Sequence, residues 1–157
     1  MRFILIDRIL NVEKNKSITA LKNVTLSDEI FIDHFPGNPI FPGALIIEAL
    51  SQAGGALVEI SNDFKYKAIV FMVERAKYRD YVRPGDQLIL KAEIINTQET
   101  YVHVKTKAVV NNKTKVSADL VFSLLRMEDF FNKQFQFHSK ILYEIWLKGK
   151  VTIKNNQ

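Results

Sequence analysis

Hydrophobic and polar positions along the chain alternate in six stretches, which predict about six strands. Residues 2–13 and 17–25 are rich in strand-forming residues and flank the turn Glu13-Lys14-Asn15-Lys16, so we expect a hairpin there. The other predicted strands cover residues 66–79, 87–96, 100–110 and 114–126, with turn-forming residues between them. One segment differs, because residues 44–60 run almost without polar interruption and their length and Ala/Leu content favour a helix. The pattern predicts an α+β fold in which an antiparallel sheet packs on this helix.

Two further segments break the strand pattern. Residues 33–43, DHFPGNPIFPG, contain three prolines and two glycines, a composition that excludes a helix and a central strand and predicts a shaped loop. Near the C-terminus, Ile141, Leu142, Ile145 and Trp146 fall at helical spacing, so residues 137–147 are expected to form an amphipathic helix. This helix either extends the core or docks on another protein or a membrane. We therefore divide the chain into a domain at 1–127 and an amphipathic extension at 128–157.

The composition of the 157 residues is that of an ordinary soluble protein, with 47% hydrophobic and 25% charged residues. The absence of cysteine excludes a disulfide framework, a thiolate nucleophile and a thiolate–zinc site. With three histidines, we expect no metal site. We also expect no membrane span and, because Asp7 and Arg8 interrupt the apolar N-terminal run, no secretory signal, so the predicted location is cytoplasmic. The net charge of +5 favours acidic partners but does not by itself indicate nucleic acid.

The predicted helix contains a carboxylate where a buried helix would not be expected to have one. Between Ala44 and Val58 the only ionisable residue is Glu48. Burial would disfavour its charged form and keep the acid protonated near neutral pH, which is the state that a general acid needs. Gln52 lies one turn further on, where its amide can reach Glu48 and orient it. A purely structural carboxylate, satisfied by a backbone group or facing solvent, is the alternative.

His34 and Gly43 favour the catalytic interpretation. His34 begins the proline-rich loop, which would hold this proton acceptor in a defined place. Gly43 lies where the helix begins, so nearby N–H groups lack helical acceptors and can stabilise negative charge on a carbonyl oxygen. A base, an acid and an oxyanion site together suit proton abstraction next to a carbonyl, with loss or gain of a hydroxyl at the neighbouring carbon.

The string His34-Phe35-Pro36-Gly37-Asn38-Pro39-Ile40-Phe41-Pro42-Gly43, followed by Glu48 and Gln52, closely resembles the 3-hydroxyacyl-acyl-carrier-protein dehydratases of fatty-acid synthesis, which have the hot-dog fold. The separation of fourteen residues between His34 and Glu48 is similar to that of the family, and Glu rather than Asp at position 48 resembles the FabZ branch rather than the FabA branch. LIDRIL at 5–10, LKNVT at 21–25 and RPGDQL at 83–88 also resemble family segments in the expected order. The resemblance covers roughly residues 3–126.

The resemblance implies a sheet wrapped around a long central helix and a homodimer, possibly assembled into a trimer of dimers. His34 of one subunit would face Glu48 of the other. His34 would take the α-proton of a (3R)-3-hydroxyacyl thioester, Glu48 would protonate the departing hydroxyl, and the Gly43 N–H would bind the thioester oxygen, giving a trans-2-enoyl product without cofactor or metal. The expected substrate-binding residues are Gly43, Ala44, Gln52, Phe35, Phe71 and Met72.

The sequence departs from the family pattern at several positions. Asp33 replaces the usual glycine before the histidine, Tyr81 replaces a proline, and Phe71-Met72 stand where a small Ala-Gly pair is expected. Bulk at 71 and 72 could shorten or reshape the acyl tunnel. The helical tail after Met127 is also outside the usual pattern. These changes leave the His34–Glu48 pair intact, but they leave open which length of acyl chain the protein accepts and in which biosynthetic pathway it acts.

The substrate of the family arrives on an acidic acyl carrier protein through a phosphopantetheine arm. If residues 73–83 form a strand, alternation places Arg75, Lys77, Arg79 and Arg83 on one face, which could attract that carrier. A solvated face with scattered charge is the alternative. Two other functions remain open at this point: a hot-dog thioesterase, and a non-catalytic protein that binds acyl thioesters.

Overall fold

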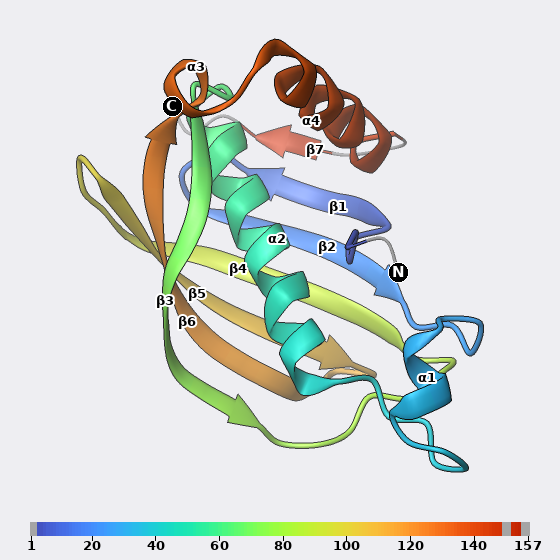
Figure 1. Cartoon of the computed structure of the whole chain (residues 1–157). Coiled ribbons are helices and arrows are strands. Elements are labelled where there is room, and N and C mark those ends of the chain that lie inside the picture. Colours follow the sequence, from blue (N-terminus) through green and yellow to red (C-terminus); the bar gives the residue numbers. More distant parts are fainter. Residues whose placement is uncertain (1–2, 149–151, 155–157) are drawn as a thin grey trace.

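A long helix lies against the concave side of a curved sheet in the computed structural model, which describes residues 3–148 and 152–154 (Figure 1). The elements in chain order are β1 (Arg8–Glu13), β2 (Ser17–Asn23), α1 (Ile30–Asp33), α2 (Gly43–Ser61), β3 (Tyr66–Tyr78), β4 (Gln87–Thr97), β5 (Tyr101–Val110), β6 (Lys113–Arg126), α3 (Met127–Phe130), α4 (Lys133–Trp146) and β7 (Thr152–Lys154). The predicted α+β hot-dog architecture, with a sheet wrapped around a central helix, is confirmed.

The strands of the described residues form one seven-stranded sheet in the order β3-β6-β5-β4-β2-β1-β7. Neighbours are antiparallel except β1 and β7, which are parallel. The chain leaves β2 near one edge, passes through α2, and re-enters the sheet as β3 at the opposite edge (Figure 1). As a result β3 pairs only with β6 among the described residues, which leave its other edge open.

Alternation along the strands directs one set of side chains toward α2. In β5, Val102, Val104 and Thr106 are buried, whereas Lys105 and Lys107 point outward. On the helix side, Ala49, Leu50, Ala53 and Leu57 have no exposed surface. Gly54 permits close packing, because a Cβ atom there would lie 3.0 Å from Phe122 Cζ. Burial of this helix face against the sheet forms the core.

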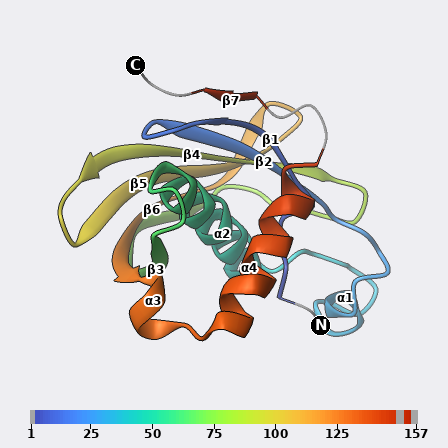
Figure 2. The ribbon, with the colours of Figure 1, turned by 90° about the horizontal axis from the view of Figure 1, so that it is seen from above.

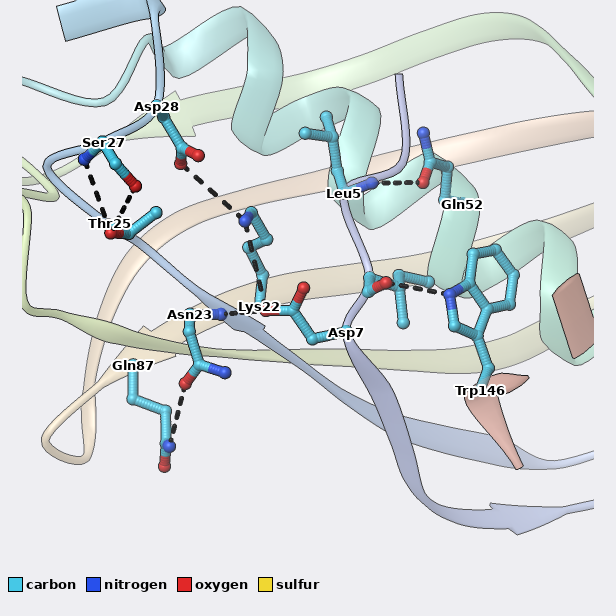
Figure 3. Close-up of polar contacts among 11 residues, drawn as sticks. Leu5, Asp7, Lys22, Asn23, Thr25, Ser27, Asp28, Gln52, Gln87 and Trp146 are labelled. Carbon is cyan, nitrogen blue, oxygen red and sulfur yellow. Dashed lines mark hydrogen bonds and ion pairs between the residues drawn. The ribbon is translucent and has the colours of Figure 1, made fainter. Parts of the chain in front are cut away.

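The predicted N-terminal strand at 2–13 is too long, and β1 begins only at Arg8. Residues 3–7 are buried at Leu5 and Ile6 but irregular, because side chains bind their backbone groups. The Leu5 N–H donates to Gln52 Oε1 at 2.9 Å, and the Ile6 carbonyl accepts from Trp146 Nε1 at 2.8 Å (Figure 3). Next to this segment, Lys22 lies between the carboxylates of Asp7 and Asp28 (Figure 3).

Three other elements differ from expectation. The short helix α1 and the strand β7 were not predicted, and β7 makes the sheet mixed rather than wholly antiparallel. The helix α2 has the length and mean hydropathy, 1.3, of a membrane span, contrary to the expectation that no segment does. In this fold 67% of that stretch is buried, which is how the core helix of a soluble protein meets the same criteria.

The predicted C-terminal helix exists and begins four residues earlier than expected, at Lys133, because Asn132 Oδ1 caps it by accepting from the Phe135 N–H at 2.8 Å. In Figure 2, α4 lies beside α2 on the side that the sheet leaves uncovered. Tyr143 and Trp146 are buried in this contact. The predicted extension 128–157 includes residues 149–151 and 155–157, which lie outside the described residues.

Glu59, at the far end of α2, anchors α4. Its buried carboxylate accepts from Tyr143 Oη at 2.6 Å and pairs with Lys67 Nζ at 2.8 Å. Burial, and then the neighbouring Glu59 carboxylate, raises the pKa of Tyr143 well above its ordinary value of 10.0, so the hydroxyl stays protonated and donates. A buried charge held by several donors fixes where α4 lies.

We predict that Tyr143→Phe lowers the free energy of unfolding by about 1.5–3 kcal/mol at neutral pH, because Glu59 loses a donor. The raised pKa means that this contribution is fully present below the ordinary tyrosine pKa of about 10 and is lost as the pH rises toward the raised value. Urea denaturation of both proteins between neutral pH and about pH 11 measures it. A gap between the two proteins that does not shrink at high pH would contradict this role of Tyr143.

Candidate active site

The loop between α1 and α2 holds His34 by hydrogen bonds along its own backbone. The Ile40 N–H donates to the His34 carbonyl at 2.9 Å, and the Asn38 N–H donates to the Phe35 carbonyl at 2.9 Å. Gly37 has φ +74°, which closes the turn at little cost for glycine. Arg83 adds a clamp from outside the loop, because its Nη1 donates to Asn38 Oδ1 at 2.7 Å. The predicted shaped loop is therefore confirmed.

One hydrogen bond determines which nitrogen of His34 can accept a proton. Nδ1 lies 2.7 Å from the Ile40 carbonyl oxygen, which can only accept, so Nδ1 carries the hydrogen of the neutral ring. Nε2 then keeps its lone pair. The ring of Phe35 stacks on the imidazole with centroids 4.1 Å apart. The half-buried imidazole is thus oriented with a basic nitrogen directed away from the carbonyl.

His34, Phe35 and Gly43 line a cavity of about 570 Å³, which we call the His34 cavity. Gly43 and Ala44 are the first residues of α2, so their N–H groups have no acceptor within the helix. The ring of Tyr78 lies directly on Gly43, and a Cβ atom at position 43 would approach Tyr78 Cε1 to 2.6 Å. Glycine at position 43 is therefore required for the packing of Tyr78, whose ring occupies the space that a side chain would take.

Charged groups from the end of β3 also border the His34 cavity. Arg79 and Asp80 line it, and Lys115 binds the Asp80 carboxylate. This hydrogen bond lowers the pKa of Asp80 below its ordinary value. The cavity thus has fixed charges of both signs at its rim.

Glu48 lies in a different place, on the face of α2 that turns toward β3 and α4. Its Oε1 accepts from Gln52 Nε2 at 3.0 Å, which confirms the predicted contact. The same amide nitrogen donates to the Phe3 carbonyl at 3.0 Å, and Gln52 Oε1 accepts from Leu5 N. Gln52 is therefore held by the N-terminal segment, and it orients the half-buried carboxylate.

Glu48 and Gln52 line a groove of about 350 Å³ that shares no lining residue with the His34 cavity. We call it the Glu48 groove. Within the described chain, His34 and Glu48, the predicted base and acid, thus border separate hollows, although they lie on one helix and on the loop before it. A single chain does not bring the two predicted catalytic side chains into one site.

Phe71 and Met72, expected to border the acyl tunnel, line neither hollow. They lie at the middle of the open edge strand β3, with 56% and 43% of their surface exposed. A bulge between Val70 and Met72 interrupts the pairing with β6 at this point. Their predicted role depends on what covers this edge.

The expectation that residues 73–83 form one alternating strand is wrong. β3 ends at Tyr78, and a bulge between Glu74 and Lys77, with Arg75 at φ +50°, breaks the alternation. Arg75 is paired with Asp119, and Arg83 holds Asn38, whereas Arg79 Nη1 donates to Ser117 Oγ at 2.8 Å. The four cations therefore do not form a single row, and Arg83 has an internal partner in the His34 loop.

The sequence analysis did not predict a role for Glu59, which follows directly after the stretch from Ala44 to Val58 in which Glu48 is the only ionisable residue. Its position was detectable, because 48, 52, 55 and 59 follow one face of a helix at i, i+4, i+7 and i+11. Its partner Tyr143 lies 84 residues away in sequence, and no local pattern indicates that contact. Among the described residues, no group of three or more His, Asp or Glu side chains gathers as a metal site would require.

Comparison with known proteins assigns most of the chain to the family that the sequence motifs resemble. Residues 1–119 match the model of the FabA-like domain. A protein of Nitratiruptor sp., named 3-hydroxyacyl-[acyl-carrier-protein] dehydratase FabZ, is 41% identical over 125 residues, covering 75% of this chain and 84% of that protein. A protein of the same name from Syntrophobacter fumaroxidans is 43% identical over 124 residues, covering 78% and 84%.

Solved structures show the shared fold at much lower identity. One component of a dehydratase heterocomplex from Xenorhabdus doucetiae has a TM-score of 0.64 and 12% identity, over 88% of this chain and 90% of that one. A Streptococcus mutans protein solved with acetyl-CoA has a TM-score of 0.63 and 18% identity, over 76% and 88%. The family model covers most of the chain and the two curated relatives are 41% and 43% identical, so the chain belongs to the FabA-like family, in its FabZ-type dehydratase branch.

Proposed function

We propose that the protein is a (3R)-3-hydroxyacyl-[acyl-carrier-protein] dehydratase of fatty-acid or related acyl-chain biosynthesis, with His34 as base and Glu48 as acid. The observation that carries the proposal is that both groups are held in a defined orientation by hydrogen bonds. The Ile40 carbonyl orients the His34 ring, and the Gln52 amide orients the Glu48 carboxyl group. A carbonyl partner leaves one imidazole nitrogen basic, and an amide partner holds a carboxyl group in place. We place the enzyme in the cytoplasm, in keeping with a chain that contains no cysteine.

His34 begins the reaction from Nε2, which removes a proton from C2 of the acyl thioester. The electron pair of that C–H bond forms the C2–C3 double bond as the C3–O bond breaks. Glu48 gives its proton to the departing hydroxyl, which leaves as water. The product is a trans-2-enoyl thioester, and transfer of the His34 proton back to Glu48 through solvent restores both groups.

Backbone N–H groups at the start of α2 stabilise the charge that develops on the thioester oxygen. Gly43, the first residue of α2, lines the His34 cavity at the positive end of the helix dipole, and Ala44 follows it in the helix but does not line the cavity. Fixed donors of this kind lower the barrier because they need no rearrangement during the reaction. Phe35, also in this cavity, packs on the imidazole and shields it from solvent.

A homodimer would complete the site through the open edge of β3. Exposed apolar side chains lie along this edge, namely Ile69, Phe71, Met72 and Val73, and an apolar edge strand is a template for pairing with another chain. The end of β3 at Tyr78 borders the His34 cavity, whereas the other end, at residues 67–70, borders the Glu48 groove. Antiparallel pairing of two copies about their middle therefore brings His34 of one subunit to Glu48 of the other.

Phe71 and Met72 would then lie at the dimer interface between the two sites, where their bulk can shape the acyl tunnel. Further assembly into a trimer of dimers stays a prediction.

The partner that delivers the substrate would be an acyl carrier protein, bound near the His34 cavity by Lys77 and Arg79. Arg79 lines that cavity and Lys77 is exposed nearby, so both can meet an acidic partner at the entrance.

Incubation with a 3-hydroxyacyl carrier protein, followed by mass spectrometry of the acyl group, tests the function directly. We expect loss of one water. His34→Ala and Glu48→Gln should each lower kcat/KM by at least about 10²-fold, because each removes a proton-transfer group. His138→Ala and Glu144→Gln, exposed changes of the same kind on α4, should leave the rate unchanged. Release of free acid would indicate a thioesterase, and binding without conversion would indicate a non-catalytic protein.

Charge reversal tests the proposed carrier site. Lys77→Glu and Arg79→Glu should weaken turnover of carrier-bound substrate about tenfold or more at low salt, because like charges then face each other. Turnover of a small thioester of N-acetylcysteamine should change much less, and Lys140→Glu, an exposed reversal on α4, should affect neither substrate. Equal losses with both substrates would count against carrier docking at these residues.

A further inference from the structure

The Glu48 groove runs along α2 from Glu48 to Glu59, over about 16 Å at the rise of an α-helix. Its floor is a stripe of small residues, Gly55 and Ala56, and β3 and Phe122 form one side. The opposite side is α4, through Ser139, Leu142, Tyr143 and Trp146. This side lies outside residues 1–119, the part of the chain that matches the family model.

Most of the polar side chains that line the groove already have hydrogen-bond or ion-pair partners. Ser51 Oγ donates to the Ile47 carbonyl at 2.9 Å, and Gln52 is engaged by Glu48 and the N-terminal segment. At the far end, Lys67 and Tyr143 both bind Glu59. The surface left to a ligand beyond Glu48 is therefore mainly apolar, and the Glu59 cluster closes its end.

The wall that α4 provides is fixed in place by two buried hydrogen bonds. Tyr143 Oη donates to Glu59 at one point, and Trp146 Nε1 donates to the Ile6 carbonyl at the other. Ile6 follows Leu5, whose N–H binds Gln52, the residue that orients Glu48 (Figure 3). A chain of hydrogen bonds thus connects α4, through Ile6, Leu5 and Gln52, to the proposed acid Glu48. These bonds hold α4 at a fixed distance from the Glu48 carboxyl group.

We propose that α4 is the outer wall of the acyl-chain pocket and that Leu142 and Trp146 limit the length of the acyl chain that the enzyme accepts. The inference rests on the proposed dehydratase function, which places C3 of the substrate beside Glu48. The acyl chain beyond C3 is apolar, and the groove that begins at Glu48 leads from the proposed acid along α2 with a mainly apolar lining. A rigid wall rejects extra methylene groups, because one methylene changes kcat/KM by about 10- to 200-fold in a fitted pocket.

Two substitutions should change chain-length selectivity in opposite directions. Leu142→Ala removes bulk from the wall and should raise the ratio of kcat/KM for a long over a short 3-hydroxyacyl substrate by about tenfold or more. Ser139→Leu fills the groove and should lower the same ratio. Ile145→Ala is the matched control, because Ile145 lies on the same helix, is half exposed and does not line the groove. An unchanged ratio in both wall variants, or an equal change in the control, would overturn the proposal.

Trp146 provides a second readout that needs no catalysis. It is the only tryptophan in the sequence and lines the groove, so its fluorescence reports what enters there. Saturated acyl-N-acetylcysteamine thioesters carry no 3-hydroxyl and cannot be dehydrated. We expect emission to change as the acyl chain of these probes is lengthened, and Ser139→Leu to abolish that response.

The two measurements separate the two proposals. A fluorescence response without dehydration of any substrate would leave the acyl pocket standing and remove the proposed activity. Dehydration with no response of Trp146 to any chain length, together with an unchanged ratio in Leu142→Ala, would leave the activity standing and remove α4 from the pocket.

Discussion

Burial of α2 against the concave sheet is the constraint on which the rest of the molecule depends. Ala49, Leu50, Ala53 and Leu57 fix one face of the helix against the strands. Its free N–H groups, Glu48, Gln52 and Glu59 then point in directions that the packed face determines. Because interiors are tightly packed and deform little, this one long helix can hold the proposed oxyanion site, the proposed acid and the anchor for α4 at set distances.

The sequence predicted the elements whose signals are local. The proline-rich loop, the helix, the hairpin turns and the contact between Glu48 and Gln52 depend on neighbouring residues, and the structure contains each of them. Features made by distant residues were missed. Residues 3–7 are irregular because Gln52 and Trp146 bind their backbone, and the expected row of cations fails because a bulge at Glu74–Lys77 turns the strand. Alternation cannot predict either.

The separation of His34 from Glu48 is the finding with the greatest consequence for mechanism. Two hollows with no common lining residue, at opposite ends of an open strand edge, are an incomplete arrangement in one chain. The proposed pairing of two β3 edges would cover the exposed apolar side chains and would supply each subunit with the catalytic residue that its own site lacks. The helix α4 is a separate addition, since it covers the side of α2 that the sheet leaves open (Figure 2), and the described part of the extension adds no strand beside β3.

Activity of mixed subunits tests the shared site most directly. When inactive His34→Ala and Glu48→Gln proteins are unfolded, mixed in equal amounts and refolded together, half of the dimers contain one copy of each variant. In such a dimer one site has both native residues and the other has neither, so the mixture should recover about one quarter of the wild-type activity. Recovery of no activity, with mixed dimers shown to be present, would contradict a site shared between subunits.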